Sequence, residues 1–140
     1  MAKAVETYRG VAYPWFCDSM GHLNTQFYAA MFDTASVQFL SVLAPYAELR
    51  PKGIGWADVR QLIEYKREVR HGAVLVARTT LKRIGTKSVE FVHALSNVET
   101  GVLHATSENI CVLFDLEKRV GLPLDDAIRC RAAALLGGGD

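Results

Sequence analysis

Residues 24–44 read "NTQFYAAMFDTASVQFLSVLA" and carry the longest helical pattern in the chain. Apolar residues recur there every three or four positions, which places them on one face of an α-helix. These residues are Phe27, Tyr28, Met31, Ala35, Phe39, Val42 and Leu43. Asn24 is a favourable N-cap, and Pro45 cannot continue the helix. We therefore predict a helix of about 20 residues, which would be roughly 30 Å long.

Patterns typical of strands lie on both sides of this helix. Residues 4–12 predict a short first strand. After the helix the period falls to two, as in the alternation of Val89, Phe91 and His93 with more polar neighbours. We expect the first of these later strands to be entered at Asp58 or later. Four such runs follow one another, over residues 56–69, 71–85, 86–101 and 102–119.

The C-terminal segment predicts a second, shorter helix. Residues 123–136 read "PLDDAIRCRAAALL", with Pro123 near a first turn and good helix formers after it. The last four residues, "GGGD" (137–140), are expected to fray. The order of elements predicts one α+β domain over residues 1–140, with its core over about residues 5–130. In it, an antiparallel five-stranded sheet wraps around one long helix. One such layer leaves a sheet edge and a sheet face open, which favours dimerisation.

Composition excludes several classes of protein. The chain has 140 residues, a net charge of +1 and 50% hydrophobic residues, so neither nucleic acid nor a membrane surface is an expected partner. No apolar run reaches the ~18 residues of a spanning helix, and the N-terminus lacks an apolar signal region. Three cysteines at wide spacing favour reduced thiols and a cytoplasmic location. His71, His93 and His104 lack metal-ligand spacing, so we expect no metal and no cofactor.

An aromatic loop precedes the long helix, and residues 15–28 read "WFCDSMGHLNTQFY". Asp18 in this loop has two interpretations. It can be a turn residue that bonds its own backbone. It can also be a reactive carboxylate beside a helix N-terminus, where backbone N–H groups are unpaired and the helix dipole is positive. Gly21 lets the loop turn close to a substrate. Cys17 is a weaker candidate nucleophile, because no base partner is evident.

His22 and Asn24 stand between that loop and the helix. His22 can orient Asp18 or a water molecule, or it can be a structural hydrogen-bonding residue. Asn24 is expected to cap the helix, with a contact to substrate or water as the alternative. The sequence alone leaves both alternatives open.

At this point the chain resembles the hotdog-fold thioesterases, in their 4-hydroxybenzoyl-CoA thioesterase-like branch. The resemblance begins with Asp18-x-x-Gly21-His22-x-Asn24 and with Tyr28 on the helix. It continues over residues 65–95, "YKREVRHGAVLVARTTLKRIGTKSVEFVHAL", and ends with residues 111–129, "CVLFDLEKRVGLPLDDAIR". It therefore covers roughly residues 5–130.

The resemblance implies an active site and an assembly. Hotdog proteins form homodimers whose sheets join into one, often as homotetramers, with active sites at the dimer interface. The family's catalytic carboxylate corresponds to Asp18, and the backbone N–H of Thr25 corresponds to the group that contacts the thioester oxygen. The family pattern also suggests that Ser88 lines the site from the partner subunit. Arg83 and Lys87 flank the "IGTK" turn, where we expect CoA phosphates to dock.

These residue types suit thioester hydrolysis. N–H groups at a helix N-terminus can stabilise an oxyanion. Asp18 can act as a general base on water, or attack the carbonyl and form a transient anhydride. We therefore predict an acyl-CoA thioesterase. The alternatives are a non-catalytic acyl-CoA binding module, which would not need Asp18, and a hotdog dehydratase or hydratase, whose histidine-containing patterns are missing here.

The sequence does not identify the acyl group. Several aromatic residues suggest a pocket for an aryl or short apolar group, or a cage for a cationic group such as a quaternary ammonium. They are Tyr13, Trp15, Phe16, Phe27 and Trp56. Trp15 and Phe16, next to Asp18, are the predicted substrate contacts. An aromatic loop can equally be part of an interface core, and the carrier of the acyl group can be CoA or an acyl carrier protein.

Overall fold

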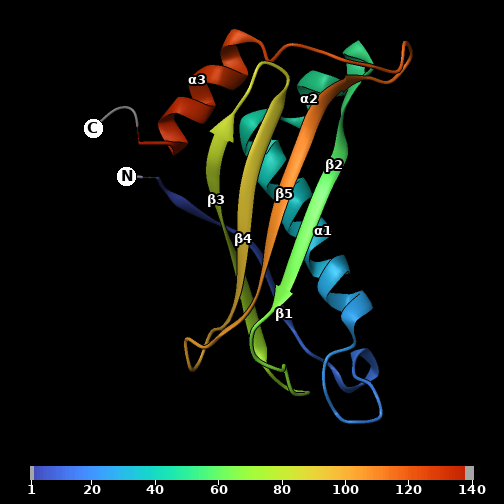
Figure 1. Ribbon diagram of the computed structural model, residues 1–140, viewed down its shortest axis with the longest axis vertical. Helices are drawn as coiled ribbons and strands as arrows, with labels where there is room; N and C mark the ends of the chain where they lie inside the picture. The colour runs from blue at the N-terminus through green and yellow to red at the C-terminus, as the bar shows by residue number, and fades with distance from the viewer. Residues whose placement is uncertain (1, 138–140) are drawn as a thin grey trace.

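The computed structural model of the protein describes residues 2–137, so most of the predicted frayed tail (138–140) lies outside the described residues. Five long strands form an antiparallel sheet in the order β1-β3-β4-β5-β2, and a two-residue strand, β6, pairs with β5. The curved sheet wraps around helix α1, as predicted (Figure 1). The main elements are β1 (Ala4–Val11), α1 (Thr25–Leu43), α2 (Tyr46–Leu49), β2 (Ile54–Tyr65), β3 (Val74–Ile84), β4 (Ser88–Asn97), β5 (Leu103–Asp115), β6 (Val120–Gly121) and α3 (Asp126–Leu135).

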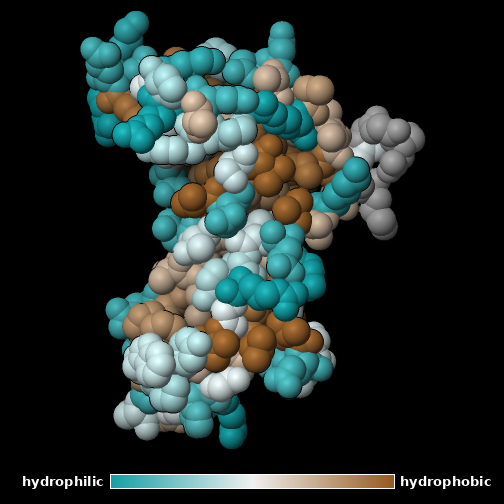
Figure 2. Space-filling view, turned by 180° about the vertical axis from the view of Figure 1, so that it is seen from behind, coloured by the Kyte–Doolittle hydropathy of each residue, from teal (hydrophilic) through white to brown (hydrophobic). Residues whose placement is uncertain are grey.

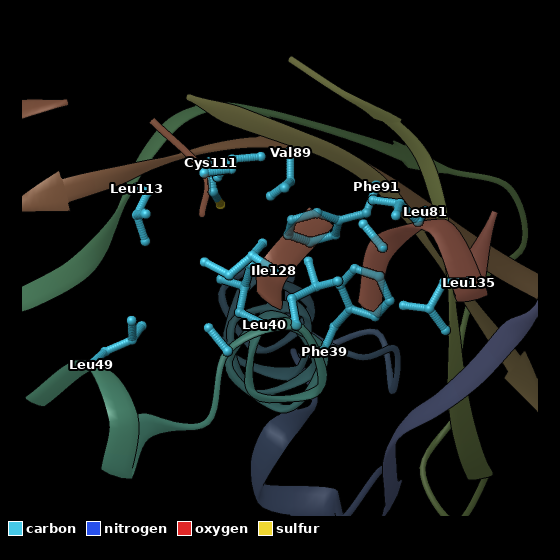
Figure 3. Close-up of a cluster of buried hydrophobic side chains, with 14 residues drawn as sticks. Phe39, Leu40, Leu49, Leu81, Val89, Phe91, Cys111, Leu113, Ile128 and Leu135 are labelled. Carbon is cyan, nitrogen blue, oxygen red and sulfur yellow. The ribbon is translucent and has the colours of Figure 1, made fainter. Parts of the chain in front are cut away.

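Helix α1 buries most of the predicted stripe, but Val42 is exposed, and Phe32 and Leu40 are buried although they were not part of it. Asn24 caps it, because its side chain accepts a hydrogen bond from the Gln26 N–H at 3.1 Å. Phe39 and Leu40 pack against Phe91 on the sheet, and α3 covers the end of this cluster (Figure 3). Full burial of such side chains contributes roughly 1.5–3 kcal/mol each. Apolar packing therefore holds the helix in place along its length.

Three element boundaries differ from the prediction. Strand β2 begins at Ile54, before Asp58, because its ladder with β5 starts at the Ile54–Asp115 pair. It ends at Tyr65, so residues 66–69 leave the sheet instead of extending the strand. Helix α3 begins at Asp126, three residues beyond Pro123, with Asp125 as its N-cap.

A chain of buried polar side chains ties α1 to the sheet. The Ser36 hydroxyl lies 2.8 Å from His93 Nε2, His93 Nδ1 lies 2.6 Å from the Thr79 hydroxyl, and Thr79 lies 2.8 Å from the Thr7 hydroxyl. Thr7 donates to the Ala77 carbonyl, which can only accept. With the Thr7 proton on the Ala77 carbonyl, each hydroxyl donates along the chain, Nδ1 of His93 carries the proton and Nε2 accepts from Ser36. Burial lowers the pKa of His93 to about 4, which keeps the ring neutral.

The face of the molecule opposite to the view of Figure 1 is only partly polar. Apolar side chains gather in its upper half and again in its lower half (Figure 2). Among the exposed apolar residues of α1 are Val37 and Val42. Within residues 2–137, no single helix is long and apolar enough to cross a membrane. Helix α1 meets that criterion only when joined to residues 46–52, across a bend of 68°.

Candidate active site

The loop before α1 is folded around the carboxylate of Asp18. One carboxylate oxygen accepts hydrogen bonds from the backbone N–H groups of Met20 (2.9 Å) and His22 (3.2 Å). Gly21 supports this turn in a left-handed conformation, with φ at +79°. The second carboxylate oxygen makes no hydrogen bond within the described part of the chain. Asp18 is therefore both a turn residue and a half-buried carboxylate with one oxygen available for chemistry.

The N-terminus of α1 opens next to this loop. Two backbone bonds fix the approach to the helix, from Leu23 N–H to the Val69 carbonyl (2.7 Å) and from Asn24 N–H to the Phe16 carbonyl (2.9 Å). The Asn24 side chain caps Gln26, whereas the N–H of Thr25 has no hydrogen-bond partner within residues 2–137. A free N–H at the positive end of a long helix is suited to bind an oxyanion.

A pocket of about 220 Å³ lies at this helix N-terminus. It is lined by His22, Leu23, Thr25, Tyr28, Tyr65, Lys66, Arg67 and Glu68. The structure thus brings together three of the predicted site residues, Thr25, His22 and Tyr28. Asp18 lies outside the pocket lining, in the adjacent loop, and binds His22 through the backbone.

One wall of the pocket was missed by the sequence analysis. Because β2 ends at Tyr65, the residues that follow turn towards the helix N-terminus, and Glu68 Oε2 lies 3.1 Å from His22 Nε2. The ring of His22 is therefore engaged with Glu68. His104, beneath this segment, accepts the N–H groups of Lys66 and Arg67 with its carbonyl, and its Nδ1 lies 3.0 Å from the Arg67 carbonyl. The sequence signal for this contact was one acidic residue, Glu68, within the basic run "YKREVR" (residues 65–70).

The aromatic residues of the loop pack largely on one another. Trp15 stacks on Tyr13 with ring centroids 4.5 Å apart, yet 70% of Trp15 is exposed. Phe16 contacts Phe27 at 4.6 Å and belongs to the edge of the core. Burial, and then the nearby charge of Asp18, raise the pKa of the Cys17 thiol, which makes it a poor nucleophile.

Arg83, Lys87 and Ser88 lie at the other end of the sheet. Arg83 is near the end of β3, Lys87 is in the β3–β4 connection and Ser88 begins β4, whereas the start of β3 pairs with the end of β1 near the Asp18 loop. In Figure 1 this connection is at the top and the loop before α1 is at the bottom. Within one protomer, these three residues are not in the pocket at Thr25. Within residues 2–137, no group of histidine, cysteine and acidic side chains is arranged to hold a metal ion.

Comparison with known proteins agrees with this geometry. A family model described as the thioesterase-like superfamily matches residues 13–132. The chain belongs to the thioesterase-like superfamily. This membership confirms the predicted family and places the chain among the thioester hydrolases. No curated protein matches the sequence significantly.

Several solved structures share the fold of this superfamily member. A Staphylococcus aureus protein in complex with CoA superposes with a TM-score of 0.87 at 15% identity, over 96% of this chain and 85% of that one. A DHNA-CoA thioesterase from the same species gives 0.80 at 19% identity, over 95% and 93%. A 1,4-dihydroxy-2-naphthoyl-CoA thioesterase from Synechocystis gives 0.77 at 18%, over 91% and 95%. At these identities the likeness confirms the hotdog fold.

Proposed function

We propose that the protein hydrolyses acyl-CoA thioesters at the N-terminus of α1, with Asp18 as general base or nucleophile. The observation that supports this most is the pairing of a free Thr25 N–H with an adjacent carboxylate that keeps one oxygen unbonded. A structural neighbour was solved with CoA, and others are named as CoA-thioester hydrolases, which supports CoA as the carrier.

In this mechanism the thioester carbonyl oxygen accepts a hydrogen bond from the Thr25 N–H. Asp18 removes a proton from water as the water oxygen attacks the carbonyl carbon. The tetrahedral intermediate collapses, the carbon–sulfur bond breaks, and CoA leaves as a thiolate. In the nucleophilic variant, a carboxylate oxygen of Asp18 bonds the carbonyl carbon, the thiolate leaves, and water then hydrolyses the anhydride.

We also propose that two copies pair through β2, so that each active site lies at a dimer interface. Strand β2 is a 12-residue sheet edge. Val59 and Leu62 on it are 62% and 41% exposed. A long sheet edge with exposed apolar side chains is a template for pairing with another strand. Antiparallel pairing would bring the partner's β3–β4 connection, with its Arg83 and Lys87 counterparts, towards the end of the molecule that holds Asp18. Such placement would give the CoA phosphates a cationic contact.

The test of function is thiol release from a panel of short, branched, aryl and charged acyl-CoA thioesters. We expect steady turnover of at least one class, followed with a thiol-reactive chromophore. A protein that is folded and inert towards the whole panel, yet binds CoA esters, would support the binding-module alternative instead.

The dimer makes a separate prediction. The double variant Val59→Glu, Leu62→Glu places two like charges on the proposed contact, where their counterparts on the partner lie close by. We expect monomers in analytical ultracentrifugation and loss of most thioesterase activity. Val98→Glu is the matched control, because Val98 is a similarly exposed apolar residue in the β4–β5 turn, away from this edge. Dimers that persist in the double variant would rule out pairing through β2.

A further inference from the structure

An apolar groove runs between the C-terminal half of α1, α2 and the first half of β2. Its volume is about 340 Å³. The main apolar lining residues are Val37, Leu40, Ala44, Leu49, Ile54 and Trp56. It adjoins a second pocket of about 260 Å³, with which it shares Asp33, Ser36 and Asp58. The three shared residues therefore lie where the two cavities meet, and this junction is the inner end of the groove.

The inner end of the groove is acidic. Asp33 comes from α1 and Asp58 from β2, which places two carboxylates on opposite walls. A bulge between Asp58 and Arg60 shifts the register of β2, and the Arg60 guanidinium lies 3.9 Å from Glu108 Oε2. Glu108 follows Ser107, whose side chain is buried in the core, so Glu108 faces the other side of the sheet. Arg60 also lines the adjoining pocket with Asp33 and Asp58, so the two carboxylates there exceed the guanidinium by one negative charge.

Ser36 adds an acceptor to this acidic end. When the buried chain is directed towards Ala77, the Ser36 proton goes to His93 and the hydroxyl offers its lone pairs to the groove. Asp58 already accepts the Cys111 thiol at 3.2 Å and keeps its second oxygen. Trp56 and Tyr46 add aromatic side chains to the lining, and the Arg50 guanidinium lies over the Tyr46 ring, 5.9 Å from its centroid. Carboxylates and aromatic faces together favour a cationic, weakly hydrated group over an anion.

The apolar part of the groove lies well away from the helix N-terminus of its own protomer. Val37 is twelve residues from Thr25, which corresponds to about 18 Å along the helix. Tyr65, at the far end of β2, lines the pocket at Thr25, whereas Trp56, near its start, lines the groove. Antiparallel pairing of two β2 strands would set the Tyr65 end of one copy beside the Trp56 end of the other. The groove of one subunit then continues the pocket of its partner.

We infer that this groove binds the acyl part of the thioester held at the partner's α1 N-terminus, and that it selects acyl groups ending in a positively charged ammonium. The inference rests on the proposed thioesterase function and on the dimer. It deepens both by naming the substrate class. The two aspartates select for charge, and the apolar walls accommodate the methylene chain.

The experiment compares CoA esters of one shape and different charge. 4-(Trimethylammonio)butanoyl-CoA and 5,5-dimethylhexanoyl-CoA differ only in a quaternary nitrogen or carbon, and adipoyl-CoA is the anionic counterpart. We expect kcat/KM for the cationic ester to exceed that for its neutral isostere by about tenfold or more, with the anionic ester poorest. Asp33→Asn and Asp58→Asn together should bring kcat/KM for the cationic and neutral esters within about threefold of each other.

Asp126→Asn is the matched control, since Asp126 is an exposed carboxylate on α3 outside the groove. It should leave the charge preference intact. Equal or faster hydrolysis of the neutral ester by the wild-type protein would overturn the inference and leave the thioesterase function standing. So would a cationic preference that survives in the double variant. Failure to hydrolyse any ester would instead count against the proposed function. The wild-type comparison needs no variant, so it remains decisive if the double variant does not fold.

Discussion

Asp18→Asn is expected to lower kcat for thioester hydrolysis at least about 100-fold, because an amide can neither take a proton from water nor attack the carbonyl. The substitution should not disturb the loop. The amide oxygen can still accept the N–H groups of Met20 and His22, which the carboxylate holds at 2.9 and 3.2 Å. KM should change little, since Asp18 makes no predicted contact with the CoA moiety. Initial rates of thiol release on the best substrate, with thermal unfolding as a check on folding, measure both quantities.

The chain offers a closely matched control for this variant. Asp115 also uses one carboxylate oxygen to accept two backbone N–H groups, from Glu117 (3.0 Å) and Lys118 (2.9 Å), in a turn after β5. Asp115→Asn should leave kcat unchanged. A kcat for Asp18→Asn above about a tenth of wild type would show that Asp18 is only a turn residue.

The two chemical roles of Asp18 differ in the fate of a labelled water. In a single turnover in ¹⁸O-water, the anhydride route can leave label in the Asp18 carboxylate, whereas direct attack by water leaves it only in the product acid. Mass spectrometry of the peptide that contains Asp18 distinguishes them. Label in Asp18 would reject the general-base mechanism.

The fold was predictable because its main elements bury a periodic face. One sheet packs on one helix, and this contact gives α1 its apolar stripe and gives β4 its alternating pattern. The alternating residues of β4, Val89, Phe91 and His93, are all buried. The boundaries of β2 were not predictable in this way. They depend on where the Ile54–Asp115 pair begins the ladder and where Tyr65 ends it. Contacts between residues that are distant in the sequence therefore set the ends of this strand, which the local sequence pattern does not determine.

The candidate site was predictable only where its residues are close in sequence. Asp18, His22 and Thr25 lie on one loop and the helix that follows it, so their proximity is local. Glu68 reaches His22 only because the chain leaves the sheet after β2, which no periodicity indicates. Arg83 and Lys87 lie at the other end of the sheet, and only a second subunit can bring their counterparts near Asp18.

His93 leads to the second large expected effect, on stability as a function of pH. Its pKa is lowered by burial from 6.5 to about 4 in the folded protein. Between these values the unfolded chain binds a proton that the folded protein does not, so the free energy of unfolding rises with pH. The stabilisation is fully present above about pH 6.5 and is lost progressively as pH falls towards 4. A pKa difference of this size corresponds to about 3 kcal/mol in the free energy of unfolding.

Urea unfolding from pH 7 to pH 4, at one fixed protein concentration, measures this slope for the wild type and for His93→Gln. The variant should be less stable at pH 7 by about 1–3 kcal/mol, since Ser36 or Thr79 loses a buried partner. It should also lose most of the wild-type slope between pH 6.5 and 4, because glutamine does not titrate. His71→Gln, at an exposed position, is the matched control and should keep the slope. If His93→Gln keeps it as well, the pH dependence arises from other groups, and the hydrogen-bond chain from α1 to β1 does not depend on a neutral ring at its centre.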